Sequence, residues 1–141
     1  MKHSILLFLL ISSMYAMAQH TSDASDKHNG WITTIDFVEI LNDHTDEALH
    51  YYDHNWKVLR KMAIAKNYIA QYQLLLTPVS EDNKISIILM TSYANQDQYD
   101  KREAHFEELI KKKGALNLMN ELQPKEFRKI VFSKEEVKHH N

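Results

Sequence analysis

Polar and apolar positions change their spacing several times along the chain, and each spacing predicts one element. Residues 31–41 (WITTIDFVEIL) are rich in β-branched and aromatic side chains, which are typical of a strand. Thr45 is then a candidate N-cap and Asn67 a candidate left-handed cap, so a long helix is predicted between them. Its apolar stripe has spacings of three and four and consists of Leu49, Tyr52, Trp56, Leu59, Met62 and Ala63.

The opposite side of this predicted helix is polar. It carries His50, Asp53, Lys57, Arg60 and Lys61. An amphipathic helix buries its apolar stripe against the core and leaves its polar side in water. We therefore expect these five side chains to face solvent.

A hairpin, a second helix and a last strand are predicted next. Residues 68–77 begin with alternating polarity, residues 85–94 are apolar in their middle, and the intervening PVSEDN has the composition of a turn. Asn95 opens a helix that three lysines and Gly114 close. Residues 115–122 are compatible with a short helix and residues 127–133 (FRKIVFS) with a strand. The apolar stripe of the second helix consists of Tyr99, Phe106, Leu109 and Ile110.

The order strand, helix, strand, strand, helix, strand predicts an α+β, ferredoxin-like fold. It has an antiparallel four-stranded sheet with two helices on one face. Apolar side chains of the two central strands point to both faces, and the helices cover only one. Each large apolar side chain left in water forfeits about 1.5–3 kcal/mol. We therefore expect a homodimer in which two sheets meet face to face.

The first 18 residues have the three parts of a signal peptide. Lys2 gives a positive start, residues 5–11 (ILLFLLI) are apolar, and Ala16-Met17-Ala18 is a small-x-small triplet before Gln19. The apolar run is shorter than the ~20 residues that a membrane span needs. We expect export to the periplasm or beyond, with no membrane attachment after cleavage. Residues 19–30 are predicted to be a flexible leader, residues 31–133 the folded domain and residues 134–141 a tail.

Composition excludes several classes of function. The 17 Lys and Arg against 19 Asp and Glu give a net charge of −2, so no nucleic-acid partner is expected. The chain has no cysteine, which excludes disulfides, thiol catalysis and cysteine-ligated metals. Two glycines are too few for a glycine-rich phosphate loop. No cofactor is predicted.

The segments DEALHYYDHNWKVLRKMA, YIAQYQLLLTPVSEDNKISIILMTSYAN and YDKREAHFEELIKK, in this order, resemble the dimeric α/β-barrel superfamily. Within it, the chain is similar to exported bacterial members with no assigned activity. The resemblance covers residues 31–133 and rests on patterning. Relatives include cofactor-independent and haem-degrading monooxygenases, chlorite-dismutase-like haem proteins, stress-responsive barrels and binding modules. The resemblance implies a pocket between sheet and helices in each subunit, but fold alone does not select among these functions.

Glu47, His50 and His54 form a candidate metal site. The two histidines are four residues apart and share a helix face with Glu47 one turn earlier. Imidazole and carboxylate suit zinc, copper or iron(II). The segment HYYDH lacks the glutamate of the HExxH motif, so metalloprotease chemistry is not predicted. In the alternative interpretation, which the neighbouring charges favour, both histidines lie on the solvated face.

His105 stands beside Phe106 at the border of the second helix's apolar stripe. In some relatives within the superfamily, a helix histidine ligates haem or acts in oxygen chemistry. The alternative is a partly exposed structural histidine.

Aromatic side chains near the sheet are candidates for lining a ligand pocket. A pocket of this kind suits a planar organic molecule, and a buried Asp36 within it could act as a general base. We predict a protein that binds a small hydrophobic or aromatic ligand. A barrel-type monooxygenase, cofactor-independent or haem-linked, and a histidine-based metal-binding protein are the alternatives, as is simple core packing of these aromatics. The pocket candidates are Asp36, Tyr52, Trp56, Tyr72, Tyr93 and His105.

Overall fold

A computed structural model describes residues 30–140. The predicted signal peptide and nearly all of the predicted leader lie outside the described residues. No helix of the described part is both long and apolar enough to cross a membrane. Along the chain the elements are β1 (Ile32–Ile40), α1 (Thr45–Tyr51), η2 (Tyr52–Trp56), α2 (Lys57–Ala65), β2 (Gln71–Leu76), β3 (Ile85–Tyr93), α3 (Gln96–Asp100), α4 (Arg102–Lys113), α5 (Pro124–Phe127) and β4 (Arg128–Lys138).

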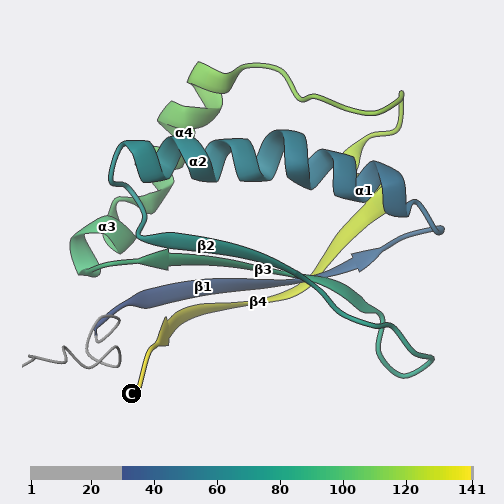
Figure 1. The fold of residues 1–141 in the computed structure, drawn as a ribbon, viewed down its shortest axis with the longest axis horizontal. Helices are drawn as coiled ribbons and strands as arrows, with labels where there is room; N and C mark the ends of the chain where they lie inside the picture. Colours follow the sequence, from purple (N-terminus) through teal and green to yellow (C-terminus); the bar gives the residue numbers. More distant parts are fainter. Residues whose placement is uncertain (1–29, 141) are drawn as a thin grey trace, which may run out of the picture.

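The four strands form one sheet in the order β2-β3-β1-β4, and every neighbouring pair is antiparallel. The helices lie together on one side of this sheet (Figure 1). This arrangement confirms the predicted α+β, ferredoxin-like fold. The side between sheet and helices is called the helix face below, and the other side the open face.

Strand register assigns each side chain to one of these faces. Val38 pairs with Ile87 and is fully buried under the helices. Phe37, one residue earlier, pairs with Ile88 on one side and with Phe132 on the other. The two phenylalanine rings are stacked with centroids 4.3 Å apart. The sequence prediction of an apolar open face is therefore confirmed, and its members are Ile35, Phe37, Leu75, Ile88, Met90 and Phe132.

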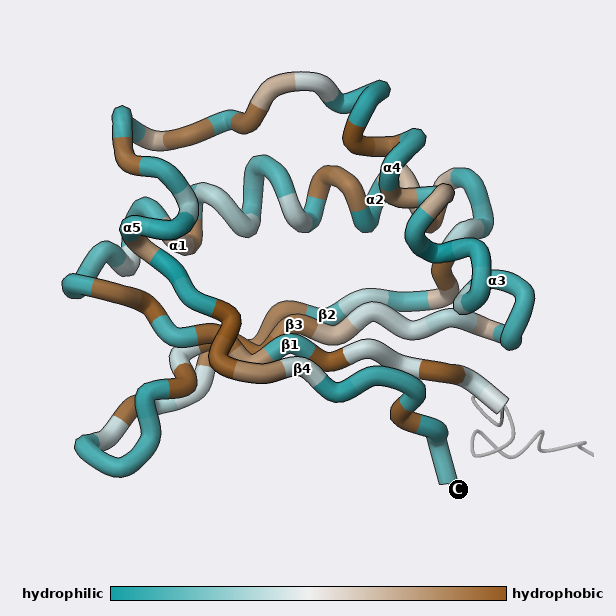
Figure 2. The backbone as a smooth tube through the Cα atoms, turned by 180° about the vertical axis from the view of Figure 1, so that it is seen from behind, coloured by the Kyte–Doolittle hydropathy of each residue, from teal (hydrophilic) through white to brown (hydrophobic). Residues whose placement is uncertain are grey.

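Two buried clusters lie under the helices. One contains Ile32, Ala63 and Leu109, and the other contains Val38 and Ile87. Figure 2 shows the hydrophobic segments running through the strands at the centre of the sheet. The clusters hold α2 and α4 on the sheet.

The long first helix contains a π-helical turn, η2, between α1 and α2. The neighbours Asn55 and Trp56 are both buried at this turn. Arg60 follows Trp56 by four residues, a spacing that keeps two side chains on nearly the same side of a helix, and its Nε donates to Thr91 of β3. The prediction that Arg60 lies on the solvated side is wrong for this reason.

Several predicted helix ends are confirmed. Asn67 and Gly114 both have positive φ, at 56° and 78°. Asn95 is the N-cap of α3, and its side chain accepts a hydrogen bond from the backbone of Gln98. At the start of the first helix, His44 rather than Thr45 is the N-cap residue.

Other details differ from the prediction. Residues 115–122 form no helix, and the short helix α5 follows them instead. Ile110, expected in the apolar stripe, is 54% exposed. Strand β4 continues to Lys138, so the prediction of a tail from residue 134 is wrong for residues 134–138. Backbone pairing with β1 extends the strand, with irregular register and a positive φ at Glu136.

Candidate functional site

Two pockets meet in the helix layer, and three side chains line both of them: Leu59, Arg60 and Ile110. The sheet pocket, of about 310 Å³, lies between strands and helices and is lined in addition by Thr34, Asp36, Tyr93, Arg102, Glu103, Phe106 and Glu135. The loop pocket, of about 260 Å³, lies under the segment that follows α4 and is lined in addition by Tyr51, Asn55, Trp56, Lys113, Gly114 and Leu116.

Arg60 is the central residue of this site. Its guanidinium carbon lies 4.4 Å from the ring centroid of Trp56 and 4.5 Å from that of Phe106. Its Nε donates to the hydroxyl of Thr91 at 3.4 Å. Among the described residues, no ion pair joins Arg60 to a carboxylate. Burial lowers the pKa of Arg60 to about 10, so the side chain is still a cation at neutral pH.

Acidic groups gather on the sheet side of Arg60. Asp36 accepts a hydrogen bond from the hydroxyl of Ser133 at 2.6 Å. Glu135 pairs with Arg102 at 3.3 Å, and the guanidinium of Arg102 also lies 4.1 Å from the ring centroid of Tyr99. The lining of the sheet pocket therefore contains both acidic and basic side chains, and some of them pair with one another.

A buried amide from η2 organises the loop pocket. Asn55 donates to the carbonyl of Tyr51 at 3.0 Å and to that of Asn117 at 2.7 Å. Its Oδ1 accepts from the Asn117 backbone and from the ammonium of Lys113, both at 2.8 Å. Lys113 also donates to the carbonyl of Ala115 at 2.9 Å. These bonds hold the segment after α4 over the pocket.

Two unpaired polar atoms lie in the same layer of the molecule. The hydroxyl of Tyr52 and the Nε of Arg128 are buried, and neither has a hydrogen-bond partner among the described residues. Arg128 donates through Nη2 to the hydroxyl of Tyr51 at 3.3 Å. Burial raises the pKa of Tyr52 to about 12, so this phenol is protonated at neutral pH.

The structure separates the predicted pocket residues into two groups. Asp36, Trp56 and Tyr93 line the pockets around Arg60. Tyr52 and Tyr72 belong to the packed core and line none of the three pockets described in this section. The ring of Tyr72 packs edge-on against Trp56, with centroids 5.7 Å apart.

His105 lies away from these pockets. Its ring is stacked on Tyr68 with centroids 3.6 Å apart, and its Nδ1 is buried without a partner among residues 30–140. Tyr68 donates to Glu108, which also pairs with Lys66. These contacts favour the interpretation of His105 as a structural histidine over its role as a haem ligand, which would have to face a cavity.

The three candidate metal ligands have separate partners. The rings of His50 and His54 are stacked with centroids 4.0 Å apart, and His50 Nε2 lies 2.9 Å from the side-chain oxygen of Asn117. His54 Nδ1 lies 3.0 Å from the carbonyl of His50. Glu47 accepts from Asn120 at 2.9 Å. Within the described part of the chain, no group of three or more His, Cys, Asp or Glu is placed to hold a metal ion.

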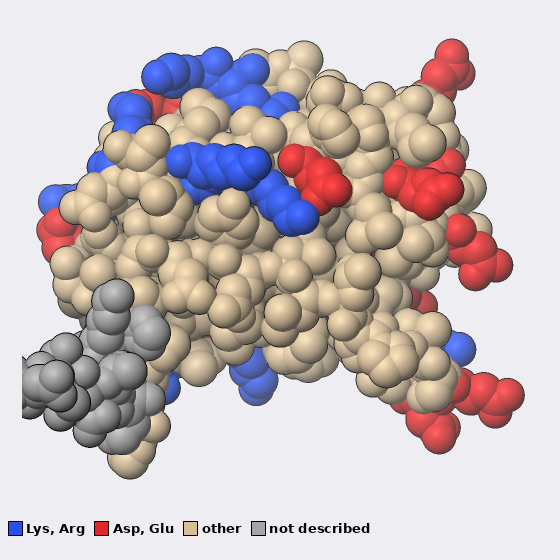
Figure 3. Space-filling view, viewed as in Figure 1, with Lys and Arg blue, Asp and Glu red and all other residues tan. Residues whose placement is uncertain are grey.

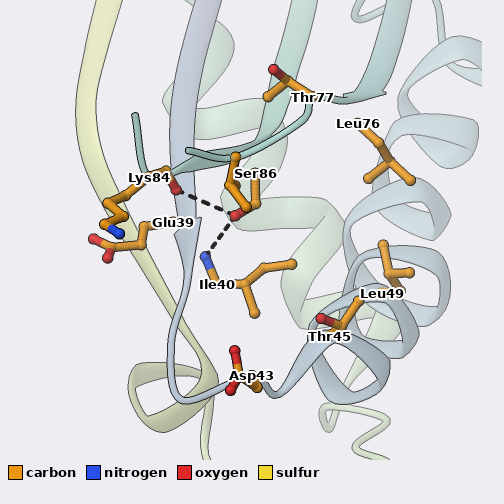
Figure 4. Close-up of a pocket in the computed structure, with 10 residues that line it drawn as sticks. Glu39, Ile40, Asp43, Thr45, Leu49, Leu76, Thr77, Lys84 and Ser86 are labelled. Carbon is orange, nitrogen blue, oxygen red and sulfur yellow. Dashed lines mark hydrogen bonds between the residues drawn. The ribbon is translucent and has the colours of Figure 1, made fainter. Parts of the chain in front are cut away.

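A third pocket, of about 480 Å³, lies at the β2–β3 hairpin, and none of the predicted site residues lines it. Figure 4 shows Ser86 at its centre, where the hydroxyl accepts from the backbone of Ile40 and donates to the carbonyl of Lys84, both at 3.3 Å. Its apolar wall includes Leu76, which is 63% exposed. The pocket therefore opens widely to solvent beside the hairpin.

No family model matches the chain, and no curated protein matches it. A solved structure from Bacteroides fragilis NCTC 9343, described as a dimeric protein of unknown function with a ferredoxin-like fold, is similar to it. The TM-score is 0.41 at 12% sequence identity, over 77% of this chain and 98% of that chain. This likeness identifies neither an activity nor a ligand.

Proposed function

We propose that the protein is an exported homodimer that binds a small apolar or aromatic molecule on the helix face, in the pockets around Arg60. The observation that carries this proposal is the meeting of the two pockets at Arg60, with the aromatic rings of Trp56, Phe106 and Tyr93 in their walls. Ligand sites are concave and mostly apolar, with a few polar groups that orient the ligand. The loop pocket has this composition, whereas the sheet pocket is lined mainly by polar and charged side chains.

The open face supports the homodimer. Its six apolar side chains form one continuous layer across the sheet, and Phe132 and Leu75 are each 45% exposed. Contiguous exposed apolar patches mark association surfaces. A second copy of the sheet, related by a two-fold axis, presents the same patch and covers the first.

A cofactor-independent oxygenase is the second candidate function, and Asp36 is the observation that favours it. The carboxylate of Asp36 lines the sheet pocket together with Tyr93. A carboxylate within reach of a bound phenol or enol can remove its proton, which is the step that prepares such a substrate for oxygen. In this case the variant D36N would bind the ligand and leave it unchanged.

Native mass spectrometry of the protein purified from its own host tests the main proposal. The expected species is a dimer that begins at Gln19 and carries a small molecule. The variant W56A should lose that molecule, because Trp56 forms a wall of the loop pocket. The control M119A changes an exposed side chain outside both pockets and should retain it. A monomer would overturn the dimer, and equal retention by W56A would overturn the binding site.

A further inference from the structure

The wall of Leu59, Arg60 and Ile110 separates two pockets of different charge. On the sheet side, three carboxylates line the pocket: Asp36, Glu103 and Glu135. On the loop side, Arg60 and Lys113 are the charged lining residues, and no acidic side chain lines the pocket. A pocket with two cations and no anion in its lining attracts a negatively charged group.

We propose that the ligand is a small organic carboxylate with a flat apolar body, held in the loop pocket with its carboxylate on Arg60 and Lys113. This inference rests on the proposed function, because it names the class of molecule that the site binds.

The hydrogen-bonding of Arg60 supports this orientation. Its Nε donates to Thr91, and no ion pair joins Arg60 to a carboxylate among residues 30–140. Arg60 lines both pockets, so its guanidinium faces a ligand placed in either of them. A guanidinium binds a carboxylate through two parallel N–H···O bonds. The rings of Trp56 and Phe106 contact the guanidinium and restrict its movement, so little conformational freedom is lost when a ligand binds.

Lys113 provides the second cation. Its ammonium donates to Asn55 and Ala115, and an ammonium has three N–H groups, so one donor is left for a ligand. The neighbouring Lys111 instead pairs with Glu107 on the surface. Figure 3 shows Lys and Arg side chains gathered on the side of the molecule where α2 and α4 lie in Figure 1. This distribution of charge favours the approach of an anion.

The other lining residues define the apolar body of the ligand. Trp56 and Leu59 form a wall, while Ile110 and Leu116 are 54% and 50% exposed at the edge of the pocket. A ligand lying against these side chains would cover them. The volume of about 260 Å³ is slightly below the usual range for small-molecule sites, about 300–1,000 Å³. One or two fused rings fit this space better than a long chain.

Two probes of the same shape test the inference on the unaltered protein. These are 2-naphthoate and its neutral amide, 2-naphthamide, titrated by calorimetry and by quenching of tryptophan fluorescence. We expect the acid to bind at least tenfold more tightly than the amide at neutral pH. Equal affinities would overturn the carboxylate inference and leave the proposed apolar site in place. Binding of neither probe at millimolar concentration would overturn both.

Three variants locate the charge. R60M and K113M each remove one lining cation while keeping an unbranched side chain, and K112M removes an exposed neighbour as a matched control. We expect R60M and K113M each to weaken binding of the acid about tenfold more than they weaken binding of the amide. K112M should change neither. If R60M does not fold, K113M and the comparison of the two probes decide the question, and an unchanged acid affinity in K113M overturns the inference.

Discussion

The guanidinium carbon of Arg60 lies 4.4 Å from the ring centroid of Trp56, four residues earlier on the same helix. In an uninterrupted α-helix, residues four apart lie one above the other on the same face. The buried position of Trp56, at the end of η2, therefore carries Arg60 inward with it. This spacing places both a cation and an aromatic wall inside the molecule.

The first prediction concerns Asn55, the amide at the end of η2. Its side chain makes four hydrogen bonds, which join Tyr51, Lys113 and Asn117. In N55A these buried groups lose their partner, and an unsatisfied buried polar group costs about 1–3 kcal/mol. We expect urea unfolding to show a free energy of unfolding lower by about 2–4 kcal/mol.

The control for N55A is Q96A, because the amide of Gln96 bonds to Asp100 on the exposed surface of α3. Its free energy of unfolding should stay within about 0.5 kcal/mol of the wild type. Equal stability of N55A and Q96A would show that the buried amide does not hold the segment over the loop pocket.

The second prediction concerns the open face. Phe132 is half exposed and stacks on Phe37 at the centre of that face. F132E places a charge where the second copy is proposed to pack, so the dimer should dissociate at least tenfold more easily while the fold persists. Analytical ultracentrifugation over a range of concentrations measures this change.

I64E is the matched control for the open-face variant. Ile64 is 41% exposed on α2, on the other side of the molecule from the open face. The same charge placed there should leave the association constant unchanged. A dimer that dissociates in I64E and persists in F132E would locate the interface on the helices instead.

Much of the fold follows from local pattern. The β-branched run of β1, the apolar middle of β3 and the positive-φ positions at Asn67 and Gly114 each act over a few residues, so a sequence window contains the relevant information. The extension of β4 beyond Ser133 does not follow in the same way. Residues 134–138 are mostly charged, and they form a strand because the edge of β1 is free to pair with them.

The candidate site can be predicted only in part, because local pattern assigns strand faces but does not show which side chains come together in the fold. Asp36 and Tyr93 are pocket candidates from the sequence, and strand alternation puts both on the helix face, where they line the sheet pocket. Arg60 is expected in solvent because it is charged and is assigned to the polar side of the helix, although it follows Trp56 of the apolar stripe by four residues. The spacing of Trp56 and Arg60 was a usable signal, since an arginine four residues after a tryptophan can stack on its ring. The π-helical turn η2 itself is not predicted from the sequence.

The third prediction concerns the loss of stability at low pH. Hydrogen bonds from Lys66 and from the hydroxyl of Tyr68 lower the pKa of Glu108 from its usual value of 4.5. A carboxylate whose pKa is lower in the folded state stabilises the protein when the pH is above its pKa in the unfolded state. This stabilisation is lost as the pH falls through its pKa in the folded state. The melting temperature of the wild type should exceed that of E108Q at pH 7, and the difference should disappear as the pH falls below about 4.

Glu108 is exposed, so this difference should be small and should shrink in high salt. E81Q, in the exposed β2–β3 turn, is the control that measures the general effect of removing one carboxylate. A difference between wild type and E108Q that stays constant from pH 7 to pH 3 would contradict the proposed ion pair.

The last prediction concerns Tyr52, whose buried hydroxyl has no partner among the described residues. Burial raises the pKa of Tyr52 from 10.0 to about 12, so the unfolded chain ionises before the folded one. The contribution of this tyrosine to the free energy of unfolding is complete below pH 10 and is lost as the pH rises toward 12, by roughly 2–3 kcal/mol in total.

Phenylalanine at position 52 has no proton to lose. The free energy of unfolding of Y52F should therefore fall less steeply than that of the wild type between pH 10 and pH 12. The other titrating groups are common to both proteins and cancel in the difference. Urea unfolding at intervals of half a pH unit gives that difference, and parallel curves above pH 10 would show that the phenol of Tyr52 is open to water.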